Sequence, residues 1–164
     1  MKIKTLLLAL TLCDITLRAS RAEDKHPAAV DQGAPSATLR FDHLALHVAD
    51  LAASVAFYSD VFGLQEIPAA AEGTRWLSLG KGVALHLIGG RSAPVADVRS
   101  VHLALAGDNL DPILQRLRER RIPWSDSAGT LGAVERGRSD GVWQIYLRDP
   151  DGYWVEVNDA LKKK

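Results

Sequence analysis

The sequence predicts an α+β domain built from two copies of one unit, in which a strand and a helix are followed by further strands. The tetrapeptide His-Leu-Ala-Leu occurs twice, starting at His43 and at His102. Each copy lies in a stretch that alternates as a strand does, and a helix-start signal follows each one. The chain of 164 residues has the length of one ordinary domain. These observations indicate a duplicated unit.

The first unit is expected at residues 41–90. Its opening strand, 41–48, alternates so that His43 and His47 share a face. Asp50 can cap a helix whose apolar residues recur at helical spacing, and Gly63 stands where a glycine ends a helix. Three more strands are expected, at 64–67, 75–79 and 83–88, the last two joined by Gly80-Lys81-Gly82.

The second unit is expected at residues 99–159. It opens with a strand at 100–106, and Asp111-Pro112 then marks a helix start with proline in the first turn. Residues 125–141 are rich in glycine and polar residues and indicate a loop with one short strand. The last two strands, 143–147 and 153–157, flank the turn Asp149-Pro150-Asp151-Gly152.

The N-terminus differs from the rest of the chain. Lys2 and Lys4 precede an apolar stretch that is too short to span a membrane, and Ser20 and Ala22 supply small residues after it. We expect a signal peptide at 1–22, a disordered spacer at 23–38, and a protein exported to the periplasm or secreted. The only cysteine, Cys13, lies in the signal segment. It follows a leucine where a lipid-attachment motif requires a small residue, which argues against a lipid anchor.

The charge balance limits the partners. Lys and Arg number 20, as do Asp and Glu, so the chain has no net charge to attract nucleic acid or an anionic membrane. We therefore expect no nucleic-acid partner. The short apolar segment predicts no stable membrane span, and the expected partner is a small-molecule substrate.

Three stretches, at 42–51, 56–64 and 149–157, carry a resemblance to a known group of proteins. They resemble the vicinal-oxygen-chelate superfamily, which includes glyoxalase I, extradiol dioxygenases and bleomycin-resistance proteins. The resemblance implies a domain at 39–160 in which two βαβββ modules form a curved eight-stranded open barrel around one divalent metal ion. It also implies a homodimer, with each site formed within one chain or between two.

The resemblance also implies which residues bind the metal. Ligands in that superfamily come from the first and last strands of each module, and those positions match His43, His86, His102 and Glu156. Each of them alone has a simpler explanation, as a core histidine or a residue facing water. Together they favour a metal, because three imidazoles and one carboxylate suit Zn²⁺, Ni²⁺, Co²⁺ or Fe²⁺. Glyoxalase I has Glu or Gln where His86 stands, which leaves the reaction open.

Counting ligands favours one reaction. Four donors leave about two positions on a six-coordinate ion, which fits two neighbouring substrate oxygens. Three imidazoles and one carboxylate leave a divalent site with one positive charge, which favours an anionic enediolate. We therefore expect a metal-dependent lyase or isomerase of the glyoxalase I (lactoylglutathione lyase) type. In it, Glu156 is the catalytic residue and moves a proton through a metal-chelated enediolate.

Two further residues are candidates for substrate contact. His47 shares a face with His43 but lies about 13 Å further along the strand, which suits a pocket wall better than a ligand. Arg75 could bind a substrate carboxylate, although an exposed arginine facing water is the simpler interpretation.

Two other functions stay open. Without His86, the residues His43, His102 and Glu156 form the 2-His-1-Glu iron site of an extradiol-type dioxygenase. A protein that sequesters a small molecule, as resistance proteins do, is the non-enzyme alternative, and the retained metal residues argue against it. No glutathione-binding residues are recognisable, and an exported protein meets little glutathione.

Overall fold

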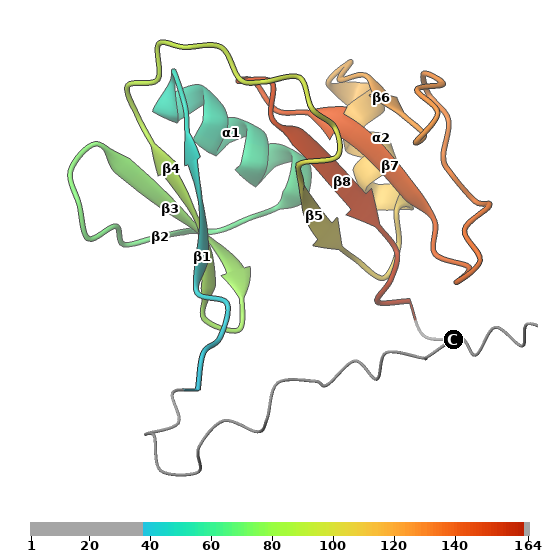
Figure 1. The fold of residues 1–164 in the computed structure, drawn as a ribbon, viewed down its shortest axis with the longest axis horizontal. Helices are drawn as coiled ribbons and strands as arrows, with labels where there is room; N and C mark the ends of the chain where they lie inside the picture. Colours follow the sequence, from blue (N-terminus) through green and yellow to red (C-terminus); the bar gives the residue numbers. More distant parts are fainter. Residues whose placement is uncertain (1–37, 163–164) are drawn as a thin grey trace, which may run out of the picture. The chain divides into compact units, whose positions relative to one another are not determined.

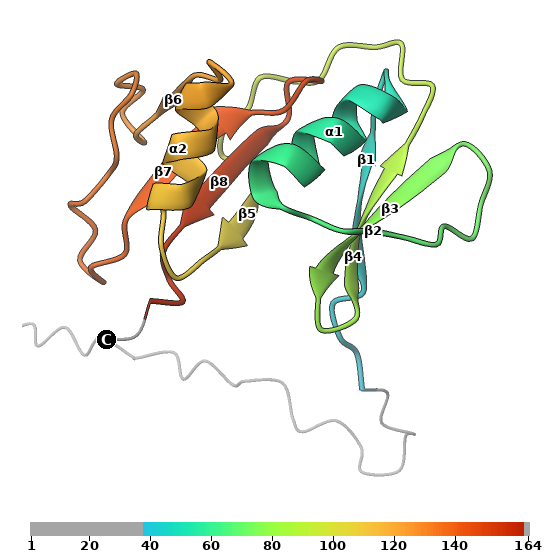
Figure 2. The same ribbon diagram turned by 180° about the vertical axis from the view of Figure 1, so that it is seen from behind.

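The computed structural model describes residues 38–162. The expected signal peptide lies outside these residues, and so does the expected spacer up to residue 37. The described elements follow the order β-α-β-β-β twice (Figures 1 and 2). Of the two helices within residues 38–162, neither has the length and hydropathy of a membrane span.

Module one contains one helix and four strands. The sheet has the order β1-β4-β3-β2, with β1 parallel to β4 and the other neighbours antiparallel. The elements are β1 (His43–His47), α1 (Leu51–Phe62), β2 (Glu66–Ile67), β3 (Thr74–Gly80) and β4 (Val83–Ile88).

Module two repeats this topology. Its sheet has the order β5-β8-β7-β6, again with the first strand parallel to the last. The elements are β5 (His102–Ala106), α2 (Asp111–Glu119), β6 (Trp124–Ser125), β7 (Gln144–Arg148) and β8 (Trp154–Asn158). No strand of one sheet pairs with a strand of the other among the described residues, so the sheets are not closed into a barrel. The predicted α+β fold of two βαβββ modules is confirmed.

Local sequence signals set the limits of α1. The Asp50 carboxylate accepts hydrogen bonds from the backbone N–H groups of Ala52 and Ala53, at 2.9 and 3.1 Å. At the other end Gly63 has a φ of 74°, a left-handed conformation that glycine adopts without strain. The expected first strand is shorter than its pattern, because only His43–His47 pairs with β4.

The strand register makes the two modules equivalent residue by residue. In each module, the last-strand residue of interest lies beside the residue two positions after the first-strand histidine. His86 is paired with Ala45 in module one, and Glu156 is paired with Ala104 in module two. The faces that alternate with these residues pack on the helices and form the core, which includes Leu85, Leu87, Val155 and Val157.

The turn between β7 and β8 joins module two to module one. Asp149 accepts a hydrogen bond from the buried Tyr58 hydroxyl of α1 at 2.9 Å. Asp151 accepts bonds from the Ala49 backbone N–H at 2.7 Å and from the Ser54 hydroxyl at 3.0 Å. The predicted turn therefore also fixes the contact between the modules.

Candidate functional site

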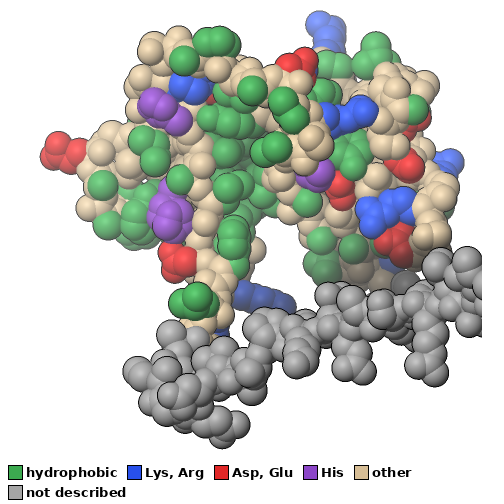
Figure 3. Space-filling view, in the orientation of Figure 1, with side chains coloured by type: hydrophobic (Ala, Val, Ile, Leu, Met, Phe, Trp, Pro, Cys, Tyr) green, Lys and Arg blue, Asp and Glu red, His purple; other side chains and the backbone are tan. Residues whose placement is uncertain are grey.

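The expected metal ligands lie on the sheet faces that the helices leave uncovered, in two pairs. Module one supplies His43 and His86, and module two supplies His102 and Glu156. Figure 3, where histidines are purple, shows histidine side chains at separate places on one face of the molecule. Among residues 38–162, no three His, Cys, Asp or Glu side chains lie close enough to hold one ion.

The pair in module one is a stack of rings. The imidazoles of His43 and His86 have centroids 4.0 Å apart and planes within 11° of parallel. The Trp76 indole stacks on His86 at the same 4.0 Å separation, with planes 4° apart. Because β4 lies between β1 and β3, His86 is held between the other two rings. Burial, together with the neighbouring His43, lowers the pKa of His86, which favours the neutral imidazole that binds metals.

The pair in module two has an unusual arrangement of lone pairs. His102 Nδ1 lies 2.8 Å from the Arg99 carbonyl oxygen, so this nitrogen must carry a proton. The other ring nitrogen, Nε2, lies 3.2 Å from Glu156 Oε2. In a neutral imidazole, this places the Nε2 lone pair against a carboxylate oxygen. The contact is favourable only with a proton or a cation between the two atoms.

His43 is oriented in the same way as His102. Its Nδ1 lies 2.7 Å from Asp42 Oδ2 and therefore donates to that carboxylate. Metal-binding histidines commonly donate their second ring N–H to a carboxylate or a backbone carbonyl, which fixes the tautomer and the ring orientation. In both first-strand histidines, His43 and His102, Nε2 is thus the ring nitrogen whose lone pair can bind a metal ion. This chemistry fits a divalent metal.

Glu156 is held by hydrogen bonds on both of its oxygens. Its side chain is buried, and it accepts from the Tyr146 hydroxyl at 2.8 Å and from the Asn158 amide at 2.7 Å. Arg138 Nη1 lies 3.8 Å from the carboxylate. Burial, followed by the hydrogen bond to Glu156, raises the pKa of Tyr146 to about 12, so its hydroxyl stays protonated and donates. The carboxylate is fixed in position.

Three residues around Glu156 belong to the site although no motif in the sequence marks them. Gln144 donates to the Tyr146 hydroxyl at 3.1 Å, and Arg138 donates to the Gln144 side chain. Tyr146 is the direct cross-strand neighbour of Glu156. Strand alternation on both sides of the predicted 149–152 turn would place Gln144 and Tyr146 on the face of Glu156, and that is the signal that could have found them.

The two expected substrate contacts lie elsewhere. His47 Nε2 donates to the Gly89 carbonyl at 3.2 Å, and the ring lines a pocket of about 480 Å³ beneath the linker between the modules. Arg75 forms an ion pair with Glu66 on the neighbouring strand. In the alternation of β3 it shares a face with the buried Leu77, opposite to the face of Trp76.

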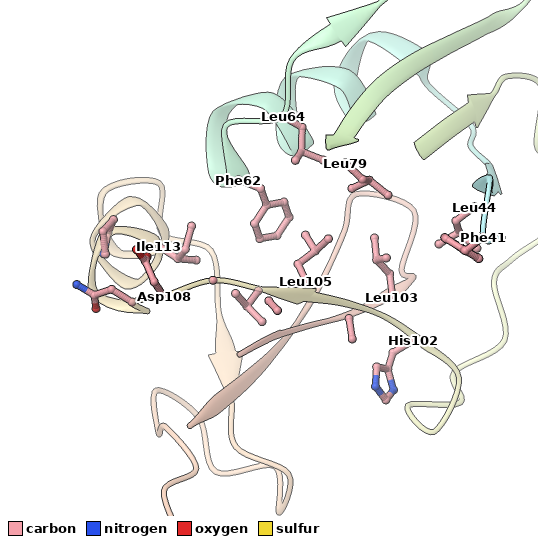
Figure 4. A pocket seen from close by; sticks show the side chains of 16 residues that line it. Phe41, Leu44, Phe62, Leu64, Leu79, His102, Leu103, Leu105, Asp108 and Ile113 are labelled. Atoms are coloured by element: carbon pink, nitrogen blue, oxygen red, sulfur yellow. The ribbon is translucent and has the colours of Figure 1, made fainter. Parts of the chain in front are cut away.

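An apolar groove of about 770 Å³ runs between the modules. Figure 4 shows Leu103 and Leu105 pointing into it toward Phe62 and Leu79, whereas His102 on the same strand points away from them. β5 therefore borders the groove along its length. Leu103 and Leu105 supply apolar surface, and His102 is the one expected ligand among the lining residues.

Comparisons with known proteins agree with this architecture. A family model described as the Glyoxalase/Bleomycin resistance protein/Dioxygenase superfamily matches residues 40–157. The fold is that of this class of protein, and the chain belongs to this superfamily. No curated protein matches the sequence at a significant level.

Solved structures named as oxidases and as a lactoylglutathione lyase are similar to the chain. Oxidase ChaP-H1 is 27% identical with a TM-score of 0.60, and the match covers 77% of this chain and 98% of that one. Lactoylglutathione lyase from Agrobacterium tumefaciens is 27% identical with a TM-score of 0.53, covering 76% and 93%. Oxidase ChaP-H2 is 22% identical with a TM-score of 0.61, covering 78% and 96%, and this likeness concerns the fold alone.

Proposed function

We propose that this protein is a metal-dependent lyase or isomerase of the glyoxalase I type, with His43, His86, His102 and Glu156 as metal ligands. The observation that carries the proposal is the contact between His102 Nε2 and Glu156 Oε2 at 3.2 Å. Because the Arg99 carbonyl holds the proton on Nδ1, neutral His102 turns the lone pair of Nε2 toward a carboxylate lone pair, and a divalent ion would make this contact favourable. A divalent ion bound there would act as a Lewis acid toward neighbouring oxygens of the substrate.

The residues of the chain divide the remaining work. Glu156 takes a proton from the carbon beside the substrate carbonyl and returns it to the neighbouring carbon. Tyr146 and Asn158 keep its carboxylate in one orientation through this cycle. The imidazoles contribute no charge, so only Glu156 offsets the two charges of the ion, and an anionic substrate oxygen is favoured.

We further propose that the complete site forms between two copies of the chain. The donors of one chain lie in two pairs, and within residues 38–162 neither pair is part of a group of three His, Cys, Asp or Glu residues that could hold a metal ion. A symmetric dimer can bring the pair His43–His86 of one copy to the pair His102–Glu156 of the other. This proposal explains why each pair lies on a sheet face that no helix of its own chain covers.

The metal and the reaction are tested together. Purified protein is expected to contain about one equivalent of a divalent transition metal per chain, and to convert the methylglyoxal–glutathione hemithioacetal or a related 2-oxo-aldehyde adduct. The His102→Ala and Glu156→Ala variants are expected to lose both properties. Retention of metal and turnover by both variants would refute the proposal. Protein that binds its small molecule without any metal would instead be a sequestering protein.

Mixed dimers test the assembly. One chain carries His43→Ala and His86→Ala, and the other carries His102→Ala and Glu156→Ala. Neither homodimer has an intact site. If sites form between chains, each mixed dimer regains one of its two sites, and random pairing yields about a quarter of the wild-type activity. If sites form within chains, mixing restores nothing, and the between-chain proposal is wrong.

An extradiol-type oxygenase is the second candidate, because oxidase ChaP-H1 is as similar in sequence as the lactoylglutathione lyase. In this case His43, His102 and Glu156 hold iron, and His86 stays out of the coordination. Oxygen uptake with catechol by the iron-loaded protein, unchanged in a His86→Ala variant, would favour this candidate. Loss of metal binding in that variant would favour the first.

Export is proposed from the N-terminal sequence alone. Cell fractionation of tagged protein is expected to place it outside the cytoplasm and shortened at its N-terminus. Full-length protein in the cytoplasm would contradict this proposal.

A further inference from the structure

In each module, the strand before the last one places an aromatic residue directly beside the expected ligand of the last strand. Trp76 on β3 is paired with His86, and Tyr146 on β7 is paired with Glu156. The two aromatic residues therefore occupy equivalent positions in the two modules. Tyr146 holds its carboxylate by a hydrogen bond of 2.8 Å, and Trp76 covers the ring of its histidine at 4.0 Å.

We propose that Trp76 is a positioning residue that holds the His86 imidazole beside His43, so that the metal site has four protein donors rather than three. This inference rests on the proposed metal site. It goes beyond that proposal because it names a residue, not itself a ligand, that determines whether the metal has four protein ligands or three.

The geometry of the stack supports this role. The Trp76 and His86 planes are 4° apart and the His86 and His43 planes are 11° apart, so His86 cannot rotate about its ring bond without leaving both neighbours. Both of its faces are covered, which leaves the ring edge, where the nitrogens lie, as its free surface. An imidazole on an open sheet face without such support would sample several rotamers, and ordering it on metal binding would weaken affinity.

The position of Trp76 argues against a role in the core alone. It is half-buried, and it lies on the uncovered face of its sheet, opposite to the face that packs on α1. Its neighbour in the strand, Leu77, is fully buried on that packed side. The indole therefore contributes to the site more than to the packing between sheet and helix.

Cobalt binding by the full chain provides the test, because the visible absorption of Co²⁺ reports ligand number independently of turnover. Affinity and spectrum are measured for the wild type, Trp76→Leu, Trp76→Phe, His86→Ala, and the double variant Trp76→Leu/His86→Ala. Trp143→Leu is the matched control, because its ring lies under Arg136 and Lys162, away from both donor pairs. Thermal unfolding of each variant is recorded alongside.

The expected result is a specific non-additive pattern. Trp76→Leu lowers Co²⁺ affinity by about tenfold and gives the spectrum of His86→Ala, since removing an orienting neighbour costs 10- to 100-fold. Trp76→Phe keeps a ring and largely restores both, whereas Trp143→Leu changes neither. In the His86→Ala background, Trp76→Leu adds no further loss, because its effect passes through His86.

Results that differ from this pattern refute either the role of Trp76 or the metal site itself, and the two cases can be told apart. An equal further loss in the His86→Ala background, or wild-type affinity and spectrum in Trp76→Leu, refutes the role of Trp76 while the metal site stands. If Trp76→Leu does not fold, Trp76→Met, which also removes the ring and is apolar, takes its place with and without His86→Ala. If wild-type protein binds no Co²⁺, the proposed function itself is wrong.

Discussion

The two modules share one backbone plan but hold their donors by different physical means. In module one, His86 lies between two aromatic rings, and no charged side chain is part of the stack. In module two, Glu156 is fixed by hydrogen bonds from Tyr146 and Asn158, with Arg138 nearby. The same strand register thus carries two neutral imidazoles in module one and an imidazole with a charged carboxylate in module two.

This difference assigns separate tasks to the modules. A buried carboxylate needs hydrogen-bond donors on its oxygens, because an unpaired buried charge is costly. A neutral imidazole needs only orientation, which flat ring contacts supply. Module two therefore carries the negative charge of the site, and module one completes the coordination. Variants that exchange or remove these supports test the comparison.

The largest effect is expected from the donors themselves. Glu156→Ala should lower metal affinity by at least about 100-fold, because it removes the only charged ligand and exceeds the effect of losing an orienting neighbour. His86→Ala should cost less, because the lost donor is neutral. Calorimetric titration with Zn²⁺ or Ni²⁺ measures both, and Glu156→Gln serves as the isosteric control. A larger loss in His86→Ala than in Glu156→Ala would contradict the assignment of charge to module two.

The contact between the modules should depend strongly on Asp151. Its side chain pairs with Arg91 of the linker, and the two are 3% and 14% exposed. Asp151→Ala should lower the free energy of unfolding by about 3 kcal/mol, because it leaves a buried arginine without its partner. Denaturant unfolding measures this loss. Asp60→Ala, which breaks the exposed contact with Arg120, is the control and should change little.

Asp151 also makes stability depend on pH. Burial alone would raise its pKa, but hydrogen bonds from Arg91, Ala49 and Ser54 outweigh burial, and the pKa lies below its usual value. The folded state therefore gains stability from this carboxylate above about pH 4 and loses it as the pH falls through the lowered pKa. Unfolding curves between neutral and acid pH should show a steeper acid loss in the wild type than in Asp151→Asn. Parallel curves would exclude this carboxylate as the cause.

A smaller loss of metal affinity is expected when the Tyr146 hydroxyl is removed. Tyr146→Phe removes the hydroxyl that donates to Glu156 but keeps the ring beside His102, so metal affinity should fall by about tenfold. Tyr153→Phe is the matched control, since its hydroxyl donates to the His47 carbonyl instead. Equal affinities in the two variants would show that the hydrogen bond does not hold the carboxylate for metal binding.

The sequence was sufficient for the fold because its strongest signals are local. Asp50 and Gly63 limit α1, and the two His-Leu-Ala-Leu copies mark the two first strands. Predicted strand ends differ by one or two residues, because pairing depends on the partner strand. It starts later than the alternation in β1 and β5 and continues past the predicted end in β3, β7 and β8. The repeat also indicated the equivalence of His43 and His102, which the register shows directly.

The surroundings of the donors required the structure. Trp76 and Tyr146 become neighbours of His86 and Glu156 only through cross-strand register, which the sequence does not specify. The sequence also left Arg75 as a candidate for substrate contact, because it could not show that Glu66 pairs with it. It could not show either that the four donors lie in two pairs within one chain.

The smallest effect is expected at the turn of module one that corresponds to the Asp149–Gly152 turn. Lys81 lies there between Gly80 and Gly82 with a φ of 51°, and both glycines face open space. Lys81→Gly relieves the left-handed conformation but adds freedom to the unfolded chain, so the free energy of unfolding should change by less than about 0.5 kcal/mol. Chemical denaturation measures this change. A loss above about 1 kcal/mol would contradict this expectation and would mean that the Lys81 side chain itself stabilises the folded state.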